Sequence, residues 1–227
     1  MAWHVVIIVV MLATGYDLYL RVRARRRERA HGGTDDLARL ESRRAFYELA
    51  GREFERARRY QHPFTIAYFD LDDFREVSRL FPHQVGDEML RLVGGAARSA
   101  VRGSDVVARL GGDQFALLLP EAGPEAAGAA VKKLQQRLQE LAEETSLPLT
   151  VSGGVVTCLQ PAESLEAAIG AADRLLQGAK AAGRDTFWSE VIVPQPIEGF
   201  EPTRLRRAYR VPPGFDLPMP PPLDRPR

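Results

Sequence analysis

The chain has 227 residues, of which 45% are hydrophobic and 27% are charged, and its formal net charge is +1. This length suits one domain of ordinary size with appendages, and the composition is typical of a globular protein with a substantial core. The near-zero net charge argues against a nucleic-acid partner, because such proteins usually carry an excess of basic residues on one face.

The first twenty residues are mostly apolar, and six arginines follow them within residues 21–29. A cleaved secretory signal carries its positive charge before the apolar stretch, whereas here the charge comes after it. With the positive-inside rule, this order predicts a single-pass transmembrane anchor over residues 1–20 and a basic linker over residues 21–33. The protein would then lie in the inner (cytoplasmic) membrane with its domain in the cytoplasm. An amphipathic or buried leading helix is the alternative, because His4 and Asp17 shorten the apolar run.

Residues 34–190 carry the pattern of one folded domain. Apolar residues at three- to six-residue steps predict a helix over residues 35–61. The aromatic and β-branched run at residues 64–69 predicts a buried strand. The later elements are predicted as helix, helix, hairpin, helix, strand, helix and strand, over residues 73–81, 84–101, 106–119, 124–145, 149–158, 164–181 and 186–188.

This order predicts an α/β fold, an α+β sandwich in which a central, mainly antiparallel sheet is flanked by helices. The single cysteine, Cys158, falls in an apolar run, so it is predicted to be a core residue, and no disulfide can form within the chain. Ten of the sixteen prolines lie at or beyond residue 194. Residues 191–227 are therefore predicted to form an extended or disordered proline-rich tail.

Acidic residues gather at two places in this pattern. Asp70 and Asp72 stand at the end of the predicted strand, and the turn Gly111-Gly112-Asp113-Gln114 joins the two strands of the hairpin. Mg²⁺ prefers hard oxygen ligands and often shares them with phosphates, so the carboxylates of Asp70, Asp72 and Asp113 together predict a magnesium site. The two glycines let the backbone turn tightly and leave room for a triphosphate. A plain turn and a solvated strand end are the alternative interpretations of these residues.

Four sequence blocks, in this order, resemble the GGDEF family, the diguanylate cyclases that join two GTP molecules into cyclic di-GMP. The blocks are Phe69-Asp70-Leu71-Asp72-Asp73-Phe74-Arg75, His83-Gln84-Val85-Gly86-Asp87, Arg109-Leu110-Gly111-Gly112-Asp113-Gln114-Phe115, and Ala172-Asp173 with Lys180 and Gly183-Arg184. The resemblance covers roughly residues 35–188 and implies the nucleotidyl-cyclase-like fold of that family.

The resemblance also implies which residues bind the metal and the substrate. Asp70, the backbone carbonyl of Leu71 and Asp113 would hold Mg²⁺ or Mn²⁺, and Asp113 would be catalytic by helping to deprotonate the attacking 3′ hydroxyl. The substrate-binding residues that it implies are Asp73, Phe74, Arg75, Ser78, His83, Asp87, Lys180 and Arg184. Three of these are cations suited to phosphates, and Asp87 would bond to the guanine edge.

Several positions depart from the family pattern. Gln114 stands where the signature normally has glutamate, so a step that needs a carboxylate there would be lost. Ser78 replaces an asparagine that reads guanine, and its single hydroxyl predicts weaker base selection. Arg79, Pro82 and Ser42 also differ from the residues usual at their positions.

The segment Arg102-Gly103-Ser104-Asp105 lies upstream of the signature at the spacing of the family's inhibitory site. There an arginine and an aspartate bind the product, since an arginine can hold phosphate or guanine acceptors and a carboxylate accepts from the guanine donors. A surface ion pair between Arg102 and Asp105 is the alternative interpretation.

Three functional hypotheses follow. The first is a membrane-anchored diguanylate cyclase with weakened activity, working as a homodimer because two domains must present one GTP each. The second is a catalytically inactive receptor that binds cyclic di-GMP through Arg102 and Asp105. The third is an interaction protein that keeps only the fold, with the proline-rich tail docking a partner in extended form.

Overall fold

The computed structural model describes residues 34–35, 38, 40–80, 83–145, 149–160 and 163–193. The predicted anchor over residues 1–20, the linker over residues 21–33 and residues 194–227 of the predicted tail lie outside this part. The tail was predicted to begin at residue 191, but Val191 and Ile192 belong to the last strand of the sheet. None of the helices in the described ranges is both long and apolar enough to cross a membrane.

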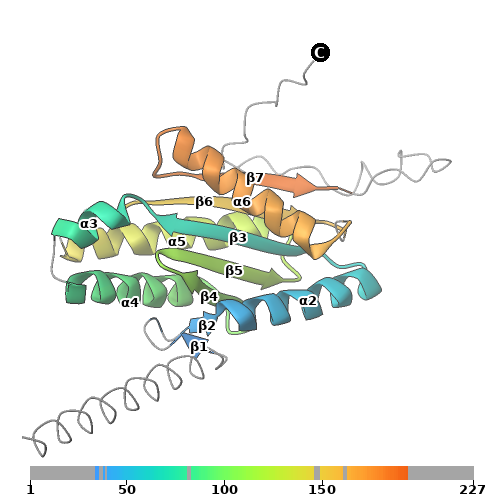
Figure 1. Ribbon diagram of the computed structural model, residues 1–227. Coiled ribbons are helices and arrows are strands. Elements are labelled where there is room, and N and C mark those ends of the chain that lie inside the picture. Colours follow the sequence, from blue (N-terminus) through green and yellow to red (C-terminus); the bar gives the residue numbers. More distant parts are fainter. Residues whose placement is uncertain are drawn as a thin grey trace, which may run out of the picture.

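Seven strands and five helices are described (Figure 1). They are β1 (Thr34–Asp35), β2 (Leu40–Ser42), α2 (Arg43–Tyr60), β3 (Phe64–Leu71), α3 (Phe74–Leu80), α4 (His83–Ala100), β4 (Val106–Gly111), β5 (Gln114–Pro120), α5 (Pro124–Thr145), β6 (Val151–Cys158), α6 (Leu165–Ala181) and β7 (Phe187–Ile192).

The strands form one sheet in the order β1-β2-β4-β5-β3-β6-β7. Four of the pairings are antiparallel, and the two parallel ones join β2 to β4 and β6 to β7. The sheet is therefore mixed, with the antiparallel strands at its centre, and the expectation of a mainly antiparallel sheet flanked by helices is confirmed.

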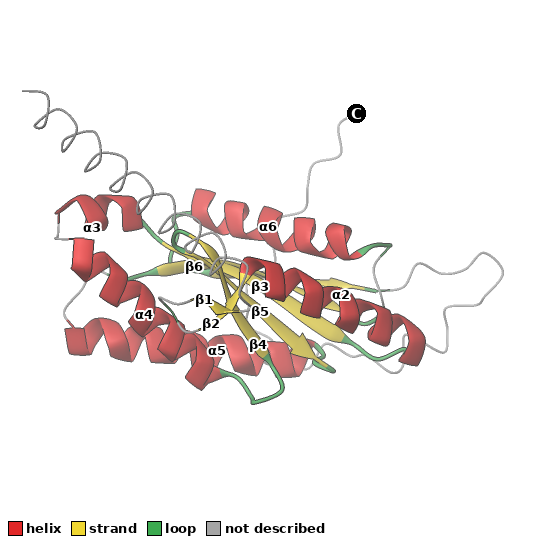
Figure 2. Cartoon of the chain, turned by 60° about the horizontal axis from the view of Figure 1, so that its bottom comes forward, coloured by secondary structure: helices red, strands yellow, loops and turns green. Residues whose placement is uncertain are grey.

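Helices cover both faces of this sheet (Figure 2). Alternate residues of β3 point to opposite faces. Phe69 and Leu71 pack in a core with α4 and α5, whereas Ile66 and Tyr68 pack in a core with α2 and α6. Cys158 is fully buried in the second core, as predicted. The alternation turns the side chain of the next even-numbered residue, Asp70, toward α6.

The helix predicted over residues 35–61 begins only at Arg43, so the prediction was wrong for Asp35 and for residues 40–42, which lie in strands. The Ser42 hydroxyl caps α2 by accepting a hydrogen bond from the Ala45 N–H at 3.3 Å. Thr34–Asp35 form β1 and Leu40–Ser42 form β2. β2 pairs with β4 through Glu41↔Ala108 and Ser42↔Arg109. Residues 40–42 therefore form a strand, because pairing with β4 outweighs the helical pattern of the local apolar residues.

Two glycines of β6 allow α6 and β7 to pack closely on the sheet. A Cβ on Gly154 would lie 2.1 Å from the carbonyl oxygen of Ala172, and one on Gly153 would lie 2.2 Å from the Phe187 ring. Since α6 carries Lys180 and leads into Arg184, this close approach brings their side chains to the end of β3.

Candidate functional site

Asp70 lies near the end of β3 and forms the centre of the site. Its Oδ2 accepts a hydrogen bond from Nζ of Lys180 on α6 at 2.6 Å. Its Oδ1 is buried and has no hydrogen-bond partner in the part of the chain that the structure describes. A buried carboxylate oxygen without a donor is costly, so this atom is available to a cation or another ligand.

The surroundings of Asp70 disfavour its charged form. The pKa of Asp70 is raised to about 6: burial is the largest cause, the hydrogen bond from Lys180 lowers the pKa, and the nearby carboxylate of Asp113 raises it. Lys180 therefore offsets only part of the cost of two neighbouring carboxylates.

The hairpin turn between β4 and β5 places Asp113 beside Asp70. Gly111 and Gly112 have φ values of 134° and 57°, a conformation that favours glycine. The Leu71 N–H donates to the carbonyl oxygen of Asp113 at 3.4 Å, which joins the turn to the end of β3. The metal ligands expected from the sequence, Asp70, Leu71 and Asp113, are thus brought together.

Arg109 holds this turn by hydrogen bonds, a role that the sequence did not predict. Its Nε and Nη2 donate to the carbonyl oxygen of Gly112 at 2.9 and 2.7 Å, and its Nη1 lies 3.4 Å from the carboxylate of Asp35 in β1. The position of Arg109, two residues before the glycines, was the only feature of the sequence that could have indicated this role. The contact with Asp35 could not be predicted, because the two residues are 74 positions apart.

The donor set fits a hard divalent cation such as Mg²⁺ or Mn²⁺. It offers an unpartnered carboxylate oxygen of Asp70 and the carboxylate of Asp113, with the backbone of Leu71 bonded to the turn that carries Asp113. Within the described ranges, no cluster of three or more His, Cys, Asp or Glu side chains could hold a metal. A cation at this site would therefore need backbone and ligand oxygens as well, which is usual for Mg²⁺ bound with phosphates.

Asp72 does not join Asp70 in this site, although the sequence places both carboxylates at the strand end. Its carboxylate accepts hydrogen bonds from Ser152 Oγ at 2.8 Å, Thr150 Oγ1 at 3.0 Å and the Asp185 N–H at 3.1 Å. The interpretation of Asp70 and Asp72 as a pair of cation ligands was therefore wrong.

The segment after α6 approaches the start of α3. Nε of Arg184 lies 3.4 Å from Oδ1 of Asp73, and both side chains are exposed. Asp73 has a φ of 52°, and its carbonyl oxygen accepts from the N–H groups of Glu76 and Val77 at 2.9 and 3.1 Å. The expected phosphate-binding cations Lys180 and Arg184 thus lie on the same side as Asp70 and Asp73.

Helix α3 crosses α4 at Gly86. A Cβ at Gly86 would lie 3.5 Å from the Phe74 ring and 3.8 Å from Cβ of Ser78. The expected substrate residues Phe74 and Ser78 therefore lie close to Gly86, and the half-buried Asp87 follows Gly86 in the chain. The Ser78 hydroxyl donates to the Arg75 carbonyl oxygen at 3.0 Å, within its own helix. The exposed Arg75 makes no ion pair among the described residues.

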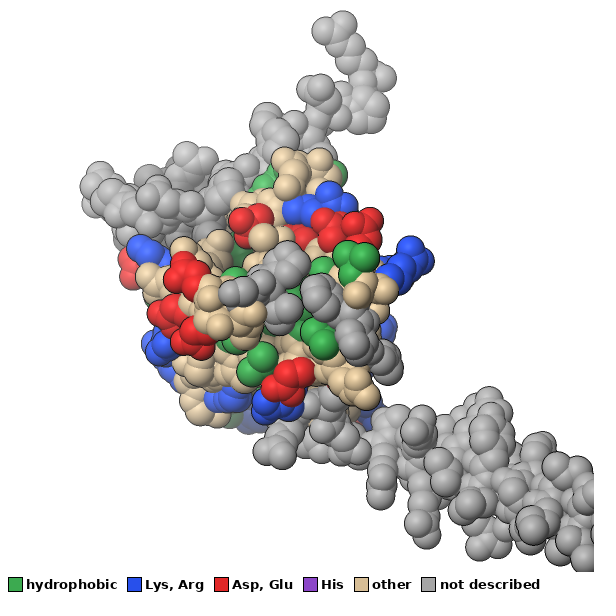
Figure 3. All heavy atoms as spheres, turned by 90° about the vertical axis from the view of Figure 1, so that its left-hand side faces the viewer, with side chains coloured by type: hydrophobic (Ala, Val, Ile, Leu, Met, Phe, Trp, Pro, Cys, Tyr) green, Lys and Arg blue, Asp and Glu red, His purple; other side chains and the backbone are tan. Residues whose placement is uncertain are grey.

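His83 is the first residue of α4, and its side chain is outside the described part of the chain. Figure 3 looks onto the end of the molecule that carries α3. There, acidic and basic side chains are interspersed around a few exposed apolar ones.

The expected product-binding residues Arg102 and Asp105 lie in the turn between α4 and β4. The Arg102 N–H donates to Oδ2 of Asp105 at 2.8 Å, and Arg98 donates to the carbonyl oxygens of both Asp105, at 2.6 Å, and Arg102. The guanidinium of Arg102 is exposed and forms no ion pair with Asp105 in the described structure. The alternative interpretation, a surface ion pair between the side chains of Arg102 and Asp105, is therefore wrong for the described structure.

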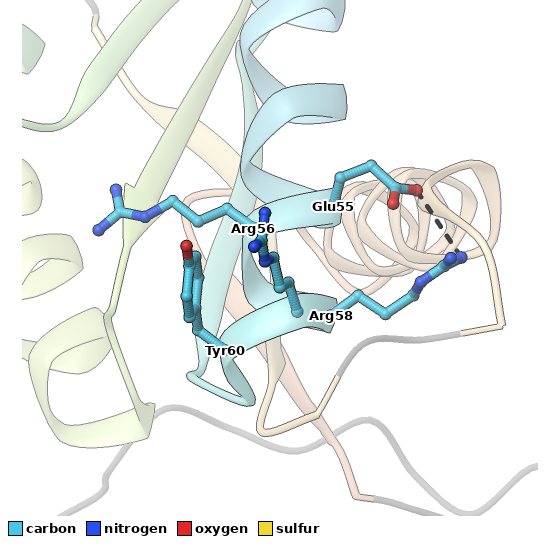
Figure 4. A pocket seen from close by; sticks show the side chains of 5 residues that line it. Glu55, Arg56, Arg58 and Tyr60 are labelled. Carbon is cyan, nitrogen blue, oxygen red and sulfur yellow. Dashed lines mark ion pairs between the residues drawn. The ribbon is translucent and has the colours of Figure 1, made fainter.

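The cavity of about 590 Å³ in Figure 4 lies elsewhere. It is lined by Glu55, Arg56, Arg58, Arg59 and Tyr60 at the C-terminal end of α2. This end of the helix leads into the start of β3, whereas Asp70 lies near the other end of that strand. The cavity therefore takes no part in the carboxylate site.

Comparisons with known proteins agree on one family. The family model described as "Diguanylate cyclase, GGDEF domain" matches residues 33–186. Diguanylate cyclase DgcP of Pseudomonas aeruginosa is 33% identical over 155 residues, which make up 67% of this chain and 23% of DgcP. This chain thus spans less than a quarter of the length of that relative.

Solved structures give the same result. The diguanylate cyclase SiaD of Pseudomonas aeruginosa, in complex with its activator SiaC, matches with a TM-score of 0.66 and 29% identity over 80% of this chain and 70% of SiaD. The GGDEF domain of DgcB from Caulobacter crescentus, in complex with c-di-GMP, matches with a TM-score of 0.63 and 26% identity over 70% of this chain and 95% of that domain.

Proposed function

Because this chain belongs to the GGDEF domain family, we propose that residues 34–190 form a diguanylate cyclase domain of weakened activity, which converts two GTP molecules into cyclic di-GMP. The observation that carries the proposal is the unpartnered Oδ1 of Asp70 beside the carboxylate of Asp113, with Lys180 and Arg184 on the same side. Two carboxylates and two cations can hold a metal-bound triphosphate.

Asp70, the carbonyl of Leu71 and Asp113 would hold Mg²⁺ or Mn²⁺, which supplies positive charge against the phosphates of GTP. The chain's own cations Arg75, Lys180 and Arg184 bind phosphate oxygens, and Lys180 remains beside Asp70 as it does so. The carboxylate of Asp113 would take up the proton of the attacking 3′ hydroxyl as its oxygen bonds to the α-phosphorus of the other GTP and pyrophosphate leaves. The half-buried Asp87 accepts from the guanine edge, with Ser78 and His83 as further substrate-binding residues.

The activity is weak in this proposal because two groups of the site have changed. Gln114 lies opposite Asp70 in the pairing of β3 with β5, so an uncharged amide replaces a third carboxylate at the reaction centre. The Ser78 hydroxyl is bonded to its own helix at Arg75, which leaves little capacity to read guanine. Both changes lower turnover and leave the candidate metal ligands in place.

The reaction also requires a homodimer. The site described above can hold one GTP, and the bond that closes cyclic di-GMP joins two of them, so a second copy has to face the first. Full-length protein incubated with GTP and Mg²⁺ should therefore yield cyclic di-GMP, with a rate per molecule that rises with protein concentration. A lack of product from both the free protein and a tethered dimer would contradict the proposal.

A second candidate function is a receptor for cyclic di-GMP. It is favoured by the turn that carries Arg102 and Asp105, which Arg98 holds through two carbonyl oxygens and which leaves the Arg102 guanidinium exposed. Calorimetric titration with cyclic di-GMP tests it directly. Binding without turnover favours the receptor, and an absence of binding to either nucleotide favours an interaction protein that keeps only the fold.

We also propose that residues 1–20 anchor the chain in the inner membrane, with the domain in the cytoplasm. The support for this is the apolar run followed by six arginines within residues 21–29. Full-length protein should then sediment with membranes and resist extraction by high salt. Release by salt alone would indicate a peripheral attachment instead.

A further inference from the structure

Asp72 is a buried carboxylate that the catalytic proposal does not use. Its residue is 5% exposed, and its two oxygens accept three hydrogen bonds, from Ser152, Thr150 and the backbone of Asp185. Its own N–H donates to the Thr150 carbonyl oxygen at 2.9 Å. Asp72 is therefore bonded both to the start of β6 and to the segment that follows α6.

The segment that Asp72 contacts is strained. Gly183, Arg184 and Asp185 have consecutive φ values of 123°, 68° and 48°. Two of the three are not glycine, and residues in this conformation persist only where their surroundings hold them. The Asp185 N–H bond to Oδ2 of Asp72, together with the Arg184 N–H bond to the Ala179 carbonyl oxygen at 3.2 Å, supplies that support.

This segment sets the position of Arg184. The carboxylate of Asp72 accepts a hydrogen bond from the backbone of Asp185, the residue after Arg184. The residue that follows Asp72 in the chain, Asp73, contacts Arg184 itself at 3.4 Å. The two residues after β3 thereby hold Arg184 near the end of that strand, where Asp70 lies.

We propose that Asp72 is a positioning residue for nucleotide binding, which holds residues 183–185 so that Arg184 faces the triphosphate site. This inference rests on the proposed function. Asp72 acts through Arg184 and does not touch the nucleotide or the metal, so its effect on affinity disappears when the Arg184 guanidinium is absent.

The test uses the full chain and the Asp72→Asn variant. An asparagine is the same size, but it offers one acceptor oxygen in place of two and cannot accept all three bonds. Glu53→Gln is the matched control, because Glu53 is a buried carboxylate of α2, 6% exposed, outside the site. The control reports what the loss of a buried charge does to the fold alone.

The first measurement is hydrogen exchange of single backbone amides by NMR. The Asp185 amide should exchange at least tenfold faster in Asp72→Asn than in the wild type or in Glu53→Gln. The Leu159 amide, which bonds to Ile192 at the far end of the sheet, should be unchanged. An unchanged Asp185 amide would overturn the proposal, whether or not the protein binds GTP.

The second measurement is affinity for a GTP analogue with a methylene group between its α and β phosphorus atoms. Asp72→Asn should weaken binding about tenfold in the wild-type background and less than twofold in an Arg184→Ala background. Equal losses in both backgrounds would overturn the proposal. If the wild type itself binds no analogue, the proposed function fails, and the exchange measurement still decides whether Asp72 holds the segment.

Discussion

Nζ of Lys180 lies 2.6 Å from Oδ2 of Asp70, so the last turn of α6 supplies the counter-charge for a half-buried carboxylate 110 residues earlier in the chain. The other oxygen of Asp70 has no partner among the described residues, and Asp113 adds a second negative charge. The negative charge of this site is therefore only partly balanced by Lys180.

Metal binding should depend on the protonation of Asp70. Its pKa is raised to about 6, chiefly by burial, and only the carboxylate form can bind a cation. The affinity for Mn²⁺, measured by electron paramagnetic resonance, should be constant above about pH 7 and fall about tenfold per pH unit below pH 6. Asp70→Asn should bind Mn²⁺ weakly at every pH. Equal wild-type affinities at pH 5 and pH 7.5 would contradict this assignment.

The same shift affects the stability of the metal-free protein. Because the folded state holds the proton of Asp70 more tightly than the unfolded state does, this group favours folding more as the pH falls from about 6 toward 4. Asp70→Asn should remove this contribution. Urea denaturation of the wild type and the variant at pH 4.5 and pH 7 measures it, and identical pH dependence in both proteins would show that the shift is absent.

Gln114→Glu should increase turnover. The register pairs position 114 with Asp70, so both side chains lie on the same face of the sheet and a new carboxylate would enter the metal site. Since a positioned acid–base group contributes about 10²- to 10⁴-fold, an increase of at least about tenfold in the rate of cyclic di-GMP formation is expected. Gln136→Glu, on the exposed face of α5, is the matched control. No gain in a protein that binds GTP would show that Gln114 does not limit the reaction.

Arg102→Ala and Arg98→Ala should differ in their effects. The Arg102 guanidinium is exposed and makes no hydrogen bond among the described residues, so its removal should weaken cyclic di-GMP binding at least tenfold without changing the melting temperature. Arg98 holds two carbonyl oxygens of the turn, so its removal should lower both affinity and stability, the latter by about 1 kcal/mol. Calorimetry and thermal denaturation measure the two effects. Wild-type affinity in Arg102→Ala would exclude the assigned site.

Gly154→Ala should destabilise the fold. The added Cβ would lie 2.1 Å from the Ala172 carbonyl oxygen and 2.5 Å from the Leu176 nitrogen, so α6 would have to move away from β6. A loss of about 3 kcal/mol or more in the free energy of unfolding is expected, at the upper end of the range for overpacked cores. Gly95→Ala is the control, because a Cβ there meets nothing within 4 Å, and it should stabilise α4 by about 0.5–1 kcal/mol. Similar losses in both variants would mean that the close approach at Gly154 is unimportant.

The sequence by itself determined most of the elements and the composition of the site. The apolar periods predicted the helices and the central strands, because the buried faces of helices and strands repeat at different intervals. The glycines at 111 and 112 predicted the turn, since few other residues adopt its backbone conformation. A shared site for Asp70 and Asp113 was predicted because the four sequence blocks resemble those of the GGDEF family in order and spacing.

Only the tertiary structure decided which partner each polar group of the site has. The local pattern predicted a helix where β1 and β2 lie, because it contains no information about pairing with β4. Asp70 and Asp72 are two residues apart, and the sequence alone does not distinguish their roles. Asp70 lies beside Lys180 and Asp113. Asp72 accepts hydrogen bonds from Ser152, Thr150 and Asp185. Hydrogen bonds and charge interactions act over a few ångströms, so these roles depend on contacts between distant segments, which exist only after the sheet has formed. The hydrogen bonds among them join residues 78 to 113 positions apart.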